Sequence, residues 1–305
     1  MKITNMRVQC LSNPIGIQEL NPVLSYTLKP EDLEKTEEGS IHICQSRYRI
    51  LAASKKELLY DDIGDLWDSG TVEQQEPFGI VYRGRKLSSR EKAYWKVKVW
   101  DNEGHASCWS HISSWEMGLF SEDWNGEWIG QGDDYDGDKS SSPMFVCDFT
   151  ADISDIKHAR LYISGLGIFQ AYLNGEKISE NLFEPGESDA AKTVYYVTYD
   201  VSEMLINGDN ALGVILGNGQ YTNFQYNPVM TNPDGTLNPA HRYQKNDGGF
   251  IKPGISGNKK LIAQLEITYK NGERVTAVSS GKGWRWTEGP VVFQNWYGGE
   301  DYDAT

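Results

Sequence analysis

Four residues in turn-rich parts of the second half of the chain have side chains suited to binding a sugar: Tyr195, Asn218, Gln220 and Tyr221. The apolar C–H face of a sugar ring stacks on a Tyr or Trp ring, and amide side chains hydrogen-bond to its hydroxyl groups. This mixture of rings and amides therefore predicts a carbohydrate-binding site. The alternative reading is that such rings lie in strands and pack in a core or pair across a sheet.

No motif in the sequence places a reactive group. The chain lacks the phosphate-binding G-x-x-x-x-G-K-[ST], the nucleophile elbow G-x-S-x-G, the metal-binding H-E-x-x-H and a dinucleotide fingerprint. Its histidines show no metal-binding spacing; they are His42, His105, His111, His158 and His241. Pairs of acids are too common in an acidic chain to identify a catalytic pair. We therefore predict no catalytic residue, no metal site and no cofactor in this chain.

A polar, acidic and glycine-rich stretch covers residues 130–142 and cannot supply a core. We expect it to be a linker between two domains. Its aspartates are loosely spaced like calcium ligands, and they are Asp133, Asp134, Asp136 and Asp138. Calcium binding stays the minor alternative, because the stretch lacks the terminal Glu and fixed Gly of the helix-loop-helix calcium site.

The elements that must position any site are short strands. Apolar and polar residues alternate over 47–51, 94–100, 160–163, 168–173, 211–216 and 261–269, with Asn-Gly turns between several of these runs. In the second run Trp95, Val97 and Val99 project to one face, and Lys96 and Lys98 to the other. Brief helices are expected only over 54–60 and 201–205. Many strands without intervening helices predict sandwiches or barrels.

Composition sets further bounds. The 305 residues predict two domains, and 29 basic against 43 acidic residues give a net charge of −14, which disfavours nucleic acid as a partner. No apolar run is long enough for a membrane span, and the start shows no signal peptide, so a cytoplasmic protein is expected. Cys10, Cys44, Cys108 and Cys147 are expected to be buried free thiols, with one or two disulfides in an exported protein as the alternative.

Residues 1–129 resemble the N-terminal region of bacterial α-L-rhamnosidases. The resemblance rests on a series of blocks in the family's order: Asn13-Pro14-Ile15-Gly16, Gln45-Ser46-Arg47-Tyr48-Arg49-Ile50, Leu66-Trp67-Asp68-Ser69-Gly70, Tyr94-Trp95-Lys96-Val97-Lys98-Val99-Trp100-Asp101 and Asp123-Trp124-Asn125-Gly126-Glu127-Trp128. In that family the region is similar to a fibronectin type III sandwich.

Residues 143–290 look like the family's second N-terminal domain, which is jelly-roll-like. The matching blocks include Gly165-Leu166-Gly167, Tyr172-Leu173-Asn174-Gly175, Glu184-Pro185-Gly186 and Leu216-Gly217-Asn218-Gly219. Residues 291–305 resemble the start of a strand that leads to a further domain. The resemblance thus implies an all-β chain of two consecutive antiparallel β-sandwiches. This chain has Ser164-Gly165-Leu166-Gly167 where sugar-binding relatives carry an acidic calcium loop, and Glu187 and Gln220 where relatives carry aromatic residues.

The family hydrolyses terminal α-L-rhamnosyl groups with inversion, using two Glu residues of a downstream α/α barrel. No segment of this chain resembles that barrel, so the resemblance implies a non-catalytic N-terminal portion, expected to be inactive alone. Its implied partners are the barrel domain and a rhamnosylated glycoside. The alternatives are a stand-alone carbohydrate-binding module and a structural spacer. A fragment of this kind should expose apolar residues near its end; the candidates are Trp284, Trp286, Val291, Val292, Phe293 and Trp296.

Overall fold

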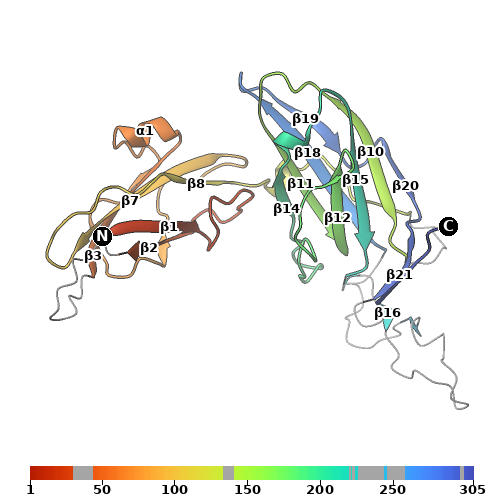
Figure 1. Cartoon of the computed structure of the whole chain (residues 1–305), viewed down its shortest axis with the longest axis horizontal. Helices are drawn as coiled ribbons and strands as arrows, with labels where there is room; N and C mark the ends of the chain where they lie inside the picture. The colour runs from red at the N-terminus through yellow and green to blue at the C-terminus, as the bar shows by residue number, and fades with distance from the viewer. Residues whose placement is uncertain are drawn as a thin grey trace, which may run out of the picture. The chain divides into compact units, whose positions relative to one another are not determined.

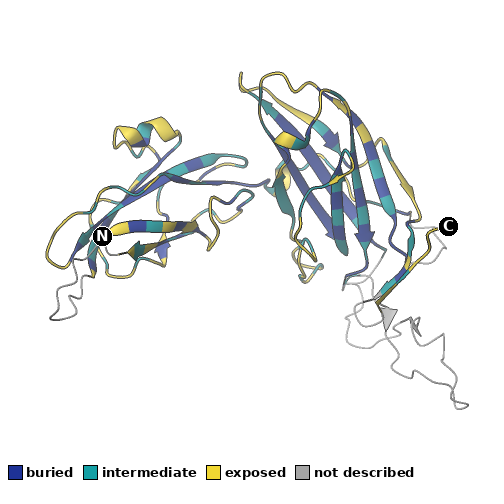
Figure 2. Ribbon diagram, viewed as in Figure 1, coloured by how far each residue is buried: buried dark blue, intermediate teal, exposed yellow. Residues whose placement is uncertain are grey.

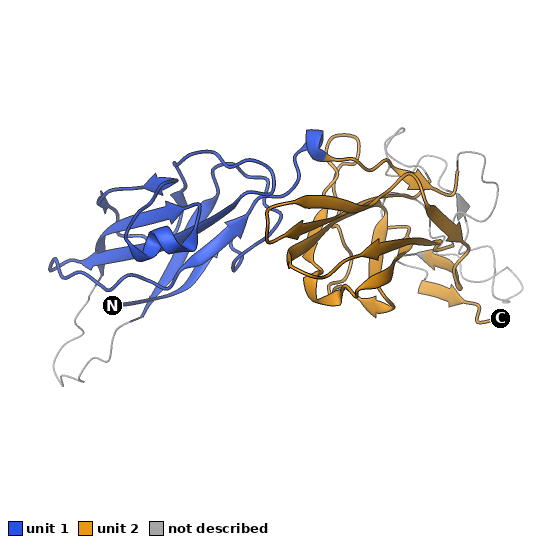
Figure 3. Ribbon diagram, turned by 90° about the horizontal axis from the view of Figure 1, so that it is seen from above, with its two compact units in different colours: residues 1–123 blue, residues 124–305 orange. Residues whose placement is uncertain are grey.

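The computed structural model describes residues 1–29, 44–132, 141–219, 221, 224–225, 244–245, 258–295 and 299–305. The chain forms two compact units, residues 1–123 and residues 124–305 (Figure 3). Both are built from antiparallel strands, so the predicted all-β fold is confirmed. Within the described residues the helices fall short of the length and apolar character that a membrane span requires.

The first unit is a sandwich of two antiparallel sheets (Figure 1). The smaller sheet has the order β1-β2-β6 and the larger has the order β4-β3-β7-β8, with β5 also paired to β3. The strands are β1 Lys2–Val8, β2 Val23–Lys29, β3 Gln45–Ala53, β4 Trp67–Asp68, β5 Val72–Glu73, β6 Ile80–Val81, β7 Lys92–Asp101 and β8 Ser113–Glu116. A short helix, α1 Lys56–Tyr60, and a 3-10 turn, η1 Ser121–Asp123, complete the unit.

Strand β7 shows how the sequence pattern builds the first core. Trp95, Val97 and Val99 are fully buried between the sheets, as their alternation predicts. Lys96 points to the opposite face but is also buried, with 5% exposure. Its ammonium group donates hydrogen bonds to the Leu59 carbonyl at the end of α1 and to the Asp62 carboxylate. Helix α1 and the turn after it therefore cover this face of β7.

The second unit packs two five-stranded antiparallel sheets, here called sheet I and sheet II. Sheet I has the order β13-β12-β15-β10-β20, and sheet II has the order β14-β11-β18-β19 with β9 paired to β18. Sheet I consists of β10 Met144–Ala151, β12 Ile168–Leu173, β13 Glu176–Lys177, β15 Gly208–Gly217 and β20 Trp284–Thr287. Sheet II consists of β9 Ile129–Gly130, β11 Ile156–Leu166, β14 Val197–Asp200, β18 Lys260–Tyr269 and β19 Arg274–Ser279.

Three smaller elements complete the second unit. The 3-10 turn η2 spans Ser202–Met204, and two hairpins pair β16 Phe224–Gln225 with β17 Gln244–Lys245 and β21 Val291–Asn295 with β22 Gly299–Tyr302. Strands β10, β11, β12, β14 and β15 alternate between the two sheets along the chain, which is the pattern of a jelly roll. The buried core lies between the sheets (Figure 2).

The outer face of sheet II is also buried, although its side chains are polar. Tyr162, Gln264 and Glu266 are 1%, 0% and 4% exposed. The segment 124–130 lies along this sheet, since the Asn125 amide donates to Gln264 Oε1 at 2.7 Å and β9 pairs with β18. The approach is close, because a Cβ atom on Gly126 would lie 2.8 Å from Ser280 Oγ.

The division of the chain therefore falls after Asp123 rather than at the expected residue 129. The residues that follow Asp123 contact the second unit, because the Asn125 amide donates to the Gln264 side chain of β18, the Glu127 amide donates to the Ser280 carbonyl after β19, and the Asn125 carbonyl accepts from Ser279 Oγ. Residues 130–132 and 141–142, expected as parts of a linker, also belong to this unit. The four candidate calcium ligands, Asp133, Asp134, Asp136 and Asp138, lie outside the described residues.

Two other expectations need correction. All four cysteines are free thiols, but only Cys147 is buried, and burial raises the pKa of its thiol. Near the end of the chain Trp286 and Val292 are each 40% exposed, whereas Phe293 is fully buried and Trp284 packs against the core. Successive side chains of a strand point to opposite faces, so neither β20 nor β21 exposes all its apolar residues. Trp296 lies outside the described residues.

Candidate carbohydrate-binding site

A cleft of about 360 Å³ lies beside the outer face of sheet I, and we call it the hairpin cleft because β21 and β22 form one of its walls. Strand β12 and strand β15 form its floor, and the loop after β13 forms the opposite wall. Its principal lining residues are Ile168, Gln170, Asn181, Leu182, Phe183, Ile215, Val291, Gln294 and Glu300. The volume falls in the range of small-ligand pockets.

The loop wall carries two exposed apolar side chains, Leu182 and Phe183, with 68% and 56% exposure. Phe183 has φ of 59°, in the left-handed region that a bulky side chain rarely adopts. Backbone conformations of this kind persist only where surrounding structure enforces them, and they are concentrated at functional sites. The loop therefore holds an aromatic ring at the cleft at a conformational cost.

Glu184 is the residue that enforces this loop conformation. Its carbonyl accepts a hydrogen bond from the Phe169 amide of β12 at 2.9 Å. Its carboxylate accepts one from Asn181 Nδ2 at 3.1 Å and another from the Tyr199 hydroxyl of β14. Burial, together with this bond to Glu184, raises the pKa of the Tyr199 hydroxyl. Glu184 is thus occupied in positioning the loop.

Gln294 supplies a buried side-chain amide at the cleft. Its side-chain Nε2 atom is buried and has no hydrogen-bond partner among the residues that the structure describes. It packs over Gly217 of β15, where a Cβ atom would lie 2.9 Å from Nε2. A buried amide without a partner costs free energy, so an acceptor from a ligand in the cleft would be favoured at this position.

Asn218 lies beside the cleft but serves the fold. It is 3% exposed, and its Nδ2 donates to the Gln294 carbonyl at 2.8 Å. Its Oδ1 accepts a hydrogen bond from the buried ammonium group of Lys259 at 2.7 Å. Asn218 therefore fixes the backbone of β21 and does not offer its amide to a ligand.

The other residues predicted from the sequence lie elsewhere or outside the described residues. Tyr195 is 52% exposed, and its carbonyl accepts a hydrogen bond from Ser164 Oγ at 2.6 Å. Tyr221 is partly buried, and neither tyrosine lines the hairpin cleft. Gln220 lies outside the described residues. The sugar-binding role of these tyrosines stays a prediction.

Sequence reasoning missed Phe183 and Gln294. The signal for Phe183 was an apolar pair, Leu182-Phe183, directly before the Pro185-Gly186 turn, where an unburied ring is unusual. Gln294 gave no comparable signal, because its position over Gly217 depends on β21 meeting β15. Neither residue could be assigned to a common cleft before the fold was known.

The hairpin cleft carries side chains that suit the binding of a sugar. An aromatic ring beside neutral amides matches a sugar's apolar face and hydroxyl groups. Glu300 is the one carboxylate among the described lining residues, whereas glycoside hydrolysis requires a pair of carboxyl groups. Over the described part of the chain no three His, Cys, Asp or Glu side chains gather as metal ligands.

Comparison with protein families covers both units. Residues 3–121 match the Rha78A-like N-terminal immunoglobulin domain, and residues 154–305 match the α-L-rhamnosidase N-terminal domain. The chain consists of N-terminal domains of the α-L-rhamnosidase family. The immunoglobulin match agrees with the expected fibronectin type III-like sandwich, because the two share this architecture.

Individual relatives support the same assignment. The chain is 33% identical to an α-L-rhamnosidase of Formosa agariphila over 96% of this chain and 30% of the relative. It is 31% identical to an α-L-rhamnosidase of Alteromonas sp. over 100% of this chain and 31% of the relative. The chain thus spans about three tenths of the length of these rhamnosidases.

Solved rhamnosidase structures share the fold of both units. The α-L-rhamnosidase from Dictyoglumus thermophilum is 31% identical with a TM-score of 0.80, covering 100% of this chain and 32% of that one. The α-L-rhamnosidase of Streptomyces avermitilis, solved with L-rhamnose, has a TM-score of 0.77 at 20% identity, covering 99% of this chain and 42% of that one. The second likeness concerns the fold alone.

Proposed function

We propose that residues 1–305 form the non-catalytic N-terminal portion of an inverting α-L-rhamnosidase. In this proposal a downstream α/α-barrel domain hydrolyses terminal α-L-rhamnosyl groups of glycosides. The two sandwiches support that domain and shape the access of the rhamnosylated substrate to it.

The observation that carries the proposal is the match of both units to N-terminal domains in relatives named α-L-rhamnosidase, of which the chain spans 29–31%. The hairpin cleft supports the non-catalytic role, because its described lining does not include the two carboxyl groups that inversion requires. Both units have their own buried core, as expected of folded supporting domains.

Hydrolysis of an aryl α-L-rhamnoside tests this proposal. We expect turnover with the polypeptide encoded by the complete gene and none with purified residues 1–305. Proton NMR of the released sugar, recorded before mutarotation, should show inversion at the anomeric carbon. Turnover by residues 1–305 alone would contradict the non-catalytic role, and a complete polypeptide without rhamnosidase activity would contradict the parent function.

A second candidate function is rhamnoside binding by the second unit as a carbohydrate-binding module. The specific observation in its favour is the hairpin cleft, where the exposed Phe183 ring lies with the unpartnered Gln294 amide. A pyranose that stacks on the ring and accepts a hydrogen bond from Nε2 would satisfy both groups.

Isothermal titration calorimetry of residues 1–305 with L-rhamnose tests this second function. Gln294→Leu should weaken binding about tenfold, which corresponds to ~1.4 kcal/mol. Tyr195→Ala is the matched control, since this ring lies outside the cleft. A loss with Tyr195→Ala alone would favour the sequence-predicted site. If neither the unsubstituted protein nor a variant releases heat, and a high sugar concentration does not raise the melting temperature, the binding-module function is refuted and the structural spacer is favoured.

A further inference from the structure

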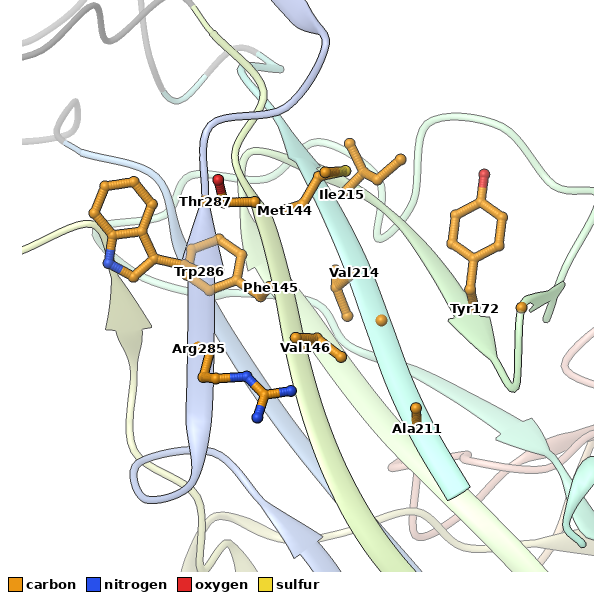
Figure 4. A pocket seen from close by; sticks show the side chains of 12 residues that line it. Met144, Phe145, Val146, Tyr172, Ala211, Val214, Ile215, Arg285, Trp286 and Thr287 are labelled. Carbon is orange, nitrogen blue, oxygen red and sulfur yellow. The ribbon is translucent and has the colours of Figure 1, made fainter. Parts of the chain in front are cut away.

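Part of the outer face of sheet I, around Met144, Val146 and Ile215, is apolar and only partly covered. A groove of about 600 Å³ runs over β10, β12, β15 and β20 (Figure 4). Met144, Val146 and Ile215 contribute partly exposed aliphatic side chains, and Tyr172 lies at one side of the groove. An antiparallel sheet with a solvated outer face normally alternates apolar residues inward with polar residues outward.

Sheet II shows the opposite arrangement in the same unit. Its outer face carries Arg160, Gln264 and Glu266, which are 5%, 0% and 4% exposed, and Asn125 of the segment 124–130 donates a hydrogen bond to Gln264. Polar side chains of sheet II are thus buried, whereas the apolar side chains Met144, Val146 and Ile215 of sheet I stay partly exposed. This difference between the two sheets indicates that the apolar part of the outer face of sheet I contacts another protein surface.

The shape of the groove suits an apolar projection. Ala211 and Gly213 of β15 form a low region between larger side chains of the neighbouring strands. A Cβ atom on Gly213 would lie 3.9 Å from its nearest neighbour, the Phe145 carbonyl oxygen, so a methyl group could be accommodated there. The ion pair of Arg285 with Asp148, 2.6 Å apart, adds charge beside the groove.

The groove is continuous with the end of the described chain. Ile215 lines both the groove and the hairpin cleft, whose wall includes Val291 of β21. The hairpin β21–β22 therefore borders the same sheet face. A domain attached after this hairpin would reach the groove at high effective concentration, so it would need less contact area to dock there than a free partner needs.

We propose that the groove formed by Met144, Val146, Tyr172, Ala211, Gly213 and Ile215 is the docking surface for the domain that follows this chain in the parent rhamnosidase. The inference rests on the proposed function and deepens it by naming the contact surface. The relatives favour this occupant, because about seven tenths of their length lies outside the match. An apolar side chain of that domain fills the low region over Gly213.

The test compares residues 1–305 with the polypeptide encoded by the complete gene. Val146→Glu places a carboxylate in the groove, opposite Arg285 on the same sheet face. We expect it to lower the melting temperature of the complete polypeptide by about 5 °C and to leave that of residues 1–305 unchanged. Thr150→Glu is the matched control, since Thr150 is exposed on the same face of β10 outside the groove, and it should affect neither protein.

Oxidation by hydrogen peroxide gives an independent readout. Met144 should oxidise in residues 1–305 and be protected in the complete polypeptide, while Met204 of η2, outside the groove, should react alike in both. If Met144 oxidises equally in residues 1–305 and in a complete polypeptide that hydrolyses rhamnosides, the docking surface is refuted and the proposed function is not. If Met144 of residues 1–305 becomes protected as the protein concentration rises, a second copy of the chain occupies the groove, and the proposed docking of the following domain is refuted. A complete polypeptide without rhamnosidase activity overturns the proposed function and this inference together.

Discussion

Asn218 illustrates how a residue chosen for binding chemistry can serve the fold instead. The Lys259 side chain is buried, with the residue 1% exposed, and its ammonium group donates to Asn218 Oδ1 at 2.7 Å. Asn218→Ala removes this acceptor from a buried cation. We expect it to lower the free energy of unfolding by about 1–3 kcal/mol, towards the upper end because the donor is charged.

Urea unfolding followed by circular dichroism measures this change. Tyr195→Ala is the control, because this ring is 52% exposed and should alter stability by less than about 0.5 kcal/mol. Equal stability of Asn218→Ala and the unsubstituted protein would refute the structural role. The Asn218-Gly219 pair predicts a turn from sequence alone, but the contact with Lys259, 41 residues later, depends on the assembled unit.

At the scale of elements, the contact of α1 with β7 predicts an acid-sensitive stability. The hydrogen bond from Lys96 is the main cause that lowers the pKa of Asp62, and the Trp109 indole adds a further hydrogen bond. Because the folded pKa lies below the unfolded value near 3.9, ionised Asp62 stabilises the fold above that pH. This contribution is lost as the pH falls through the lowered folded pKa.

Asp62→Asn should therefore destabilise the protein at pH 7 and have a smaller effect near pH 3. Thermal unfolding of both proteins across this range measures the difference. The control is Asp61→Asn, since the neighbouring Asp61 is exposed and lies outside the Lys96 contact. An effect of Asp62→Asn that does not change with pH would show that the ion pair does not stabilise the first unit.

The strands themselves were largely predictable. Alternation over 94–100 and 168–173 marks β7 and β12, since each has one face in a sandwich core. The helix expected over 54–60 is α1, and the one expected over 201–205 is the 3-10 turn η2. The burial of Lys96 and Gln264 was not predictable, because segments distant in sequence cover these polar side chains.

At the scale of the whole molecule, the sequence indicated two domains but placed their boundary too late. The composition break at residue 130 marks a polar stretch, whereas the structural division depends on which unit the preceding residues contact. Asn125 and Glu127 donate backbone hydrogen bonds to Gln264 and Ser280 of the second unit, at 2.7 and 2.8 Å. Such bonds are invisible to composition, because they involve main-chain amides.

The position of the boundary predicts different stabilities for two truncated proteins. Residues 124–305 retain the segment along sheet II, whereas residues 130–305 lack it together with its hydrogen bonds to Gln264 and Ser280. We expect the shorter protein to melt at least about 5 °C lower, because the buried Gln264 oxygen loses the Asn125 donor and the Ser280 carbonyl loses the Glu127 donor. Differential scanning calorimetry measures both transitions. Equal melting temperatures would mean that residues 124–129 do not stabilise the second unit, and the boundary would then lie at 129.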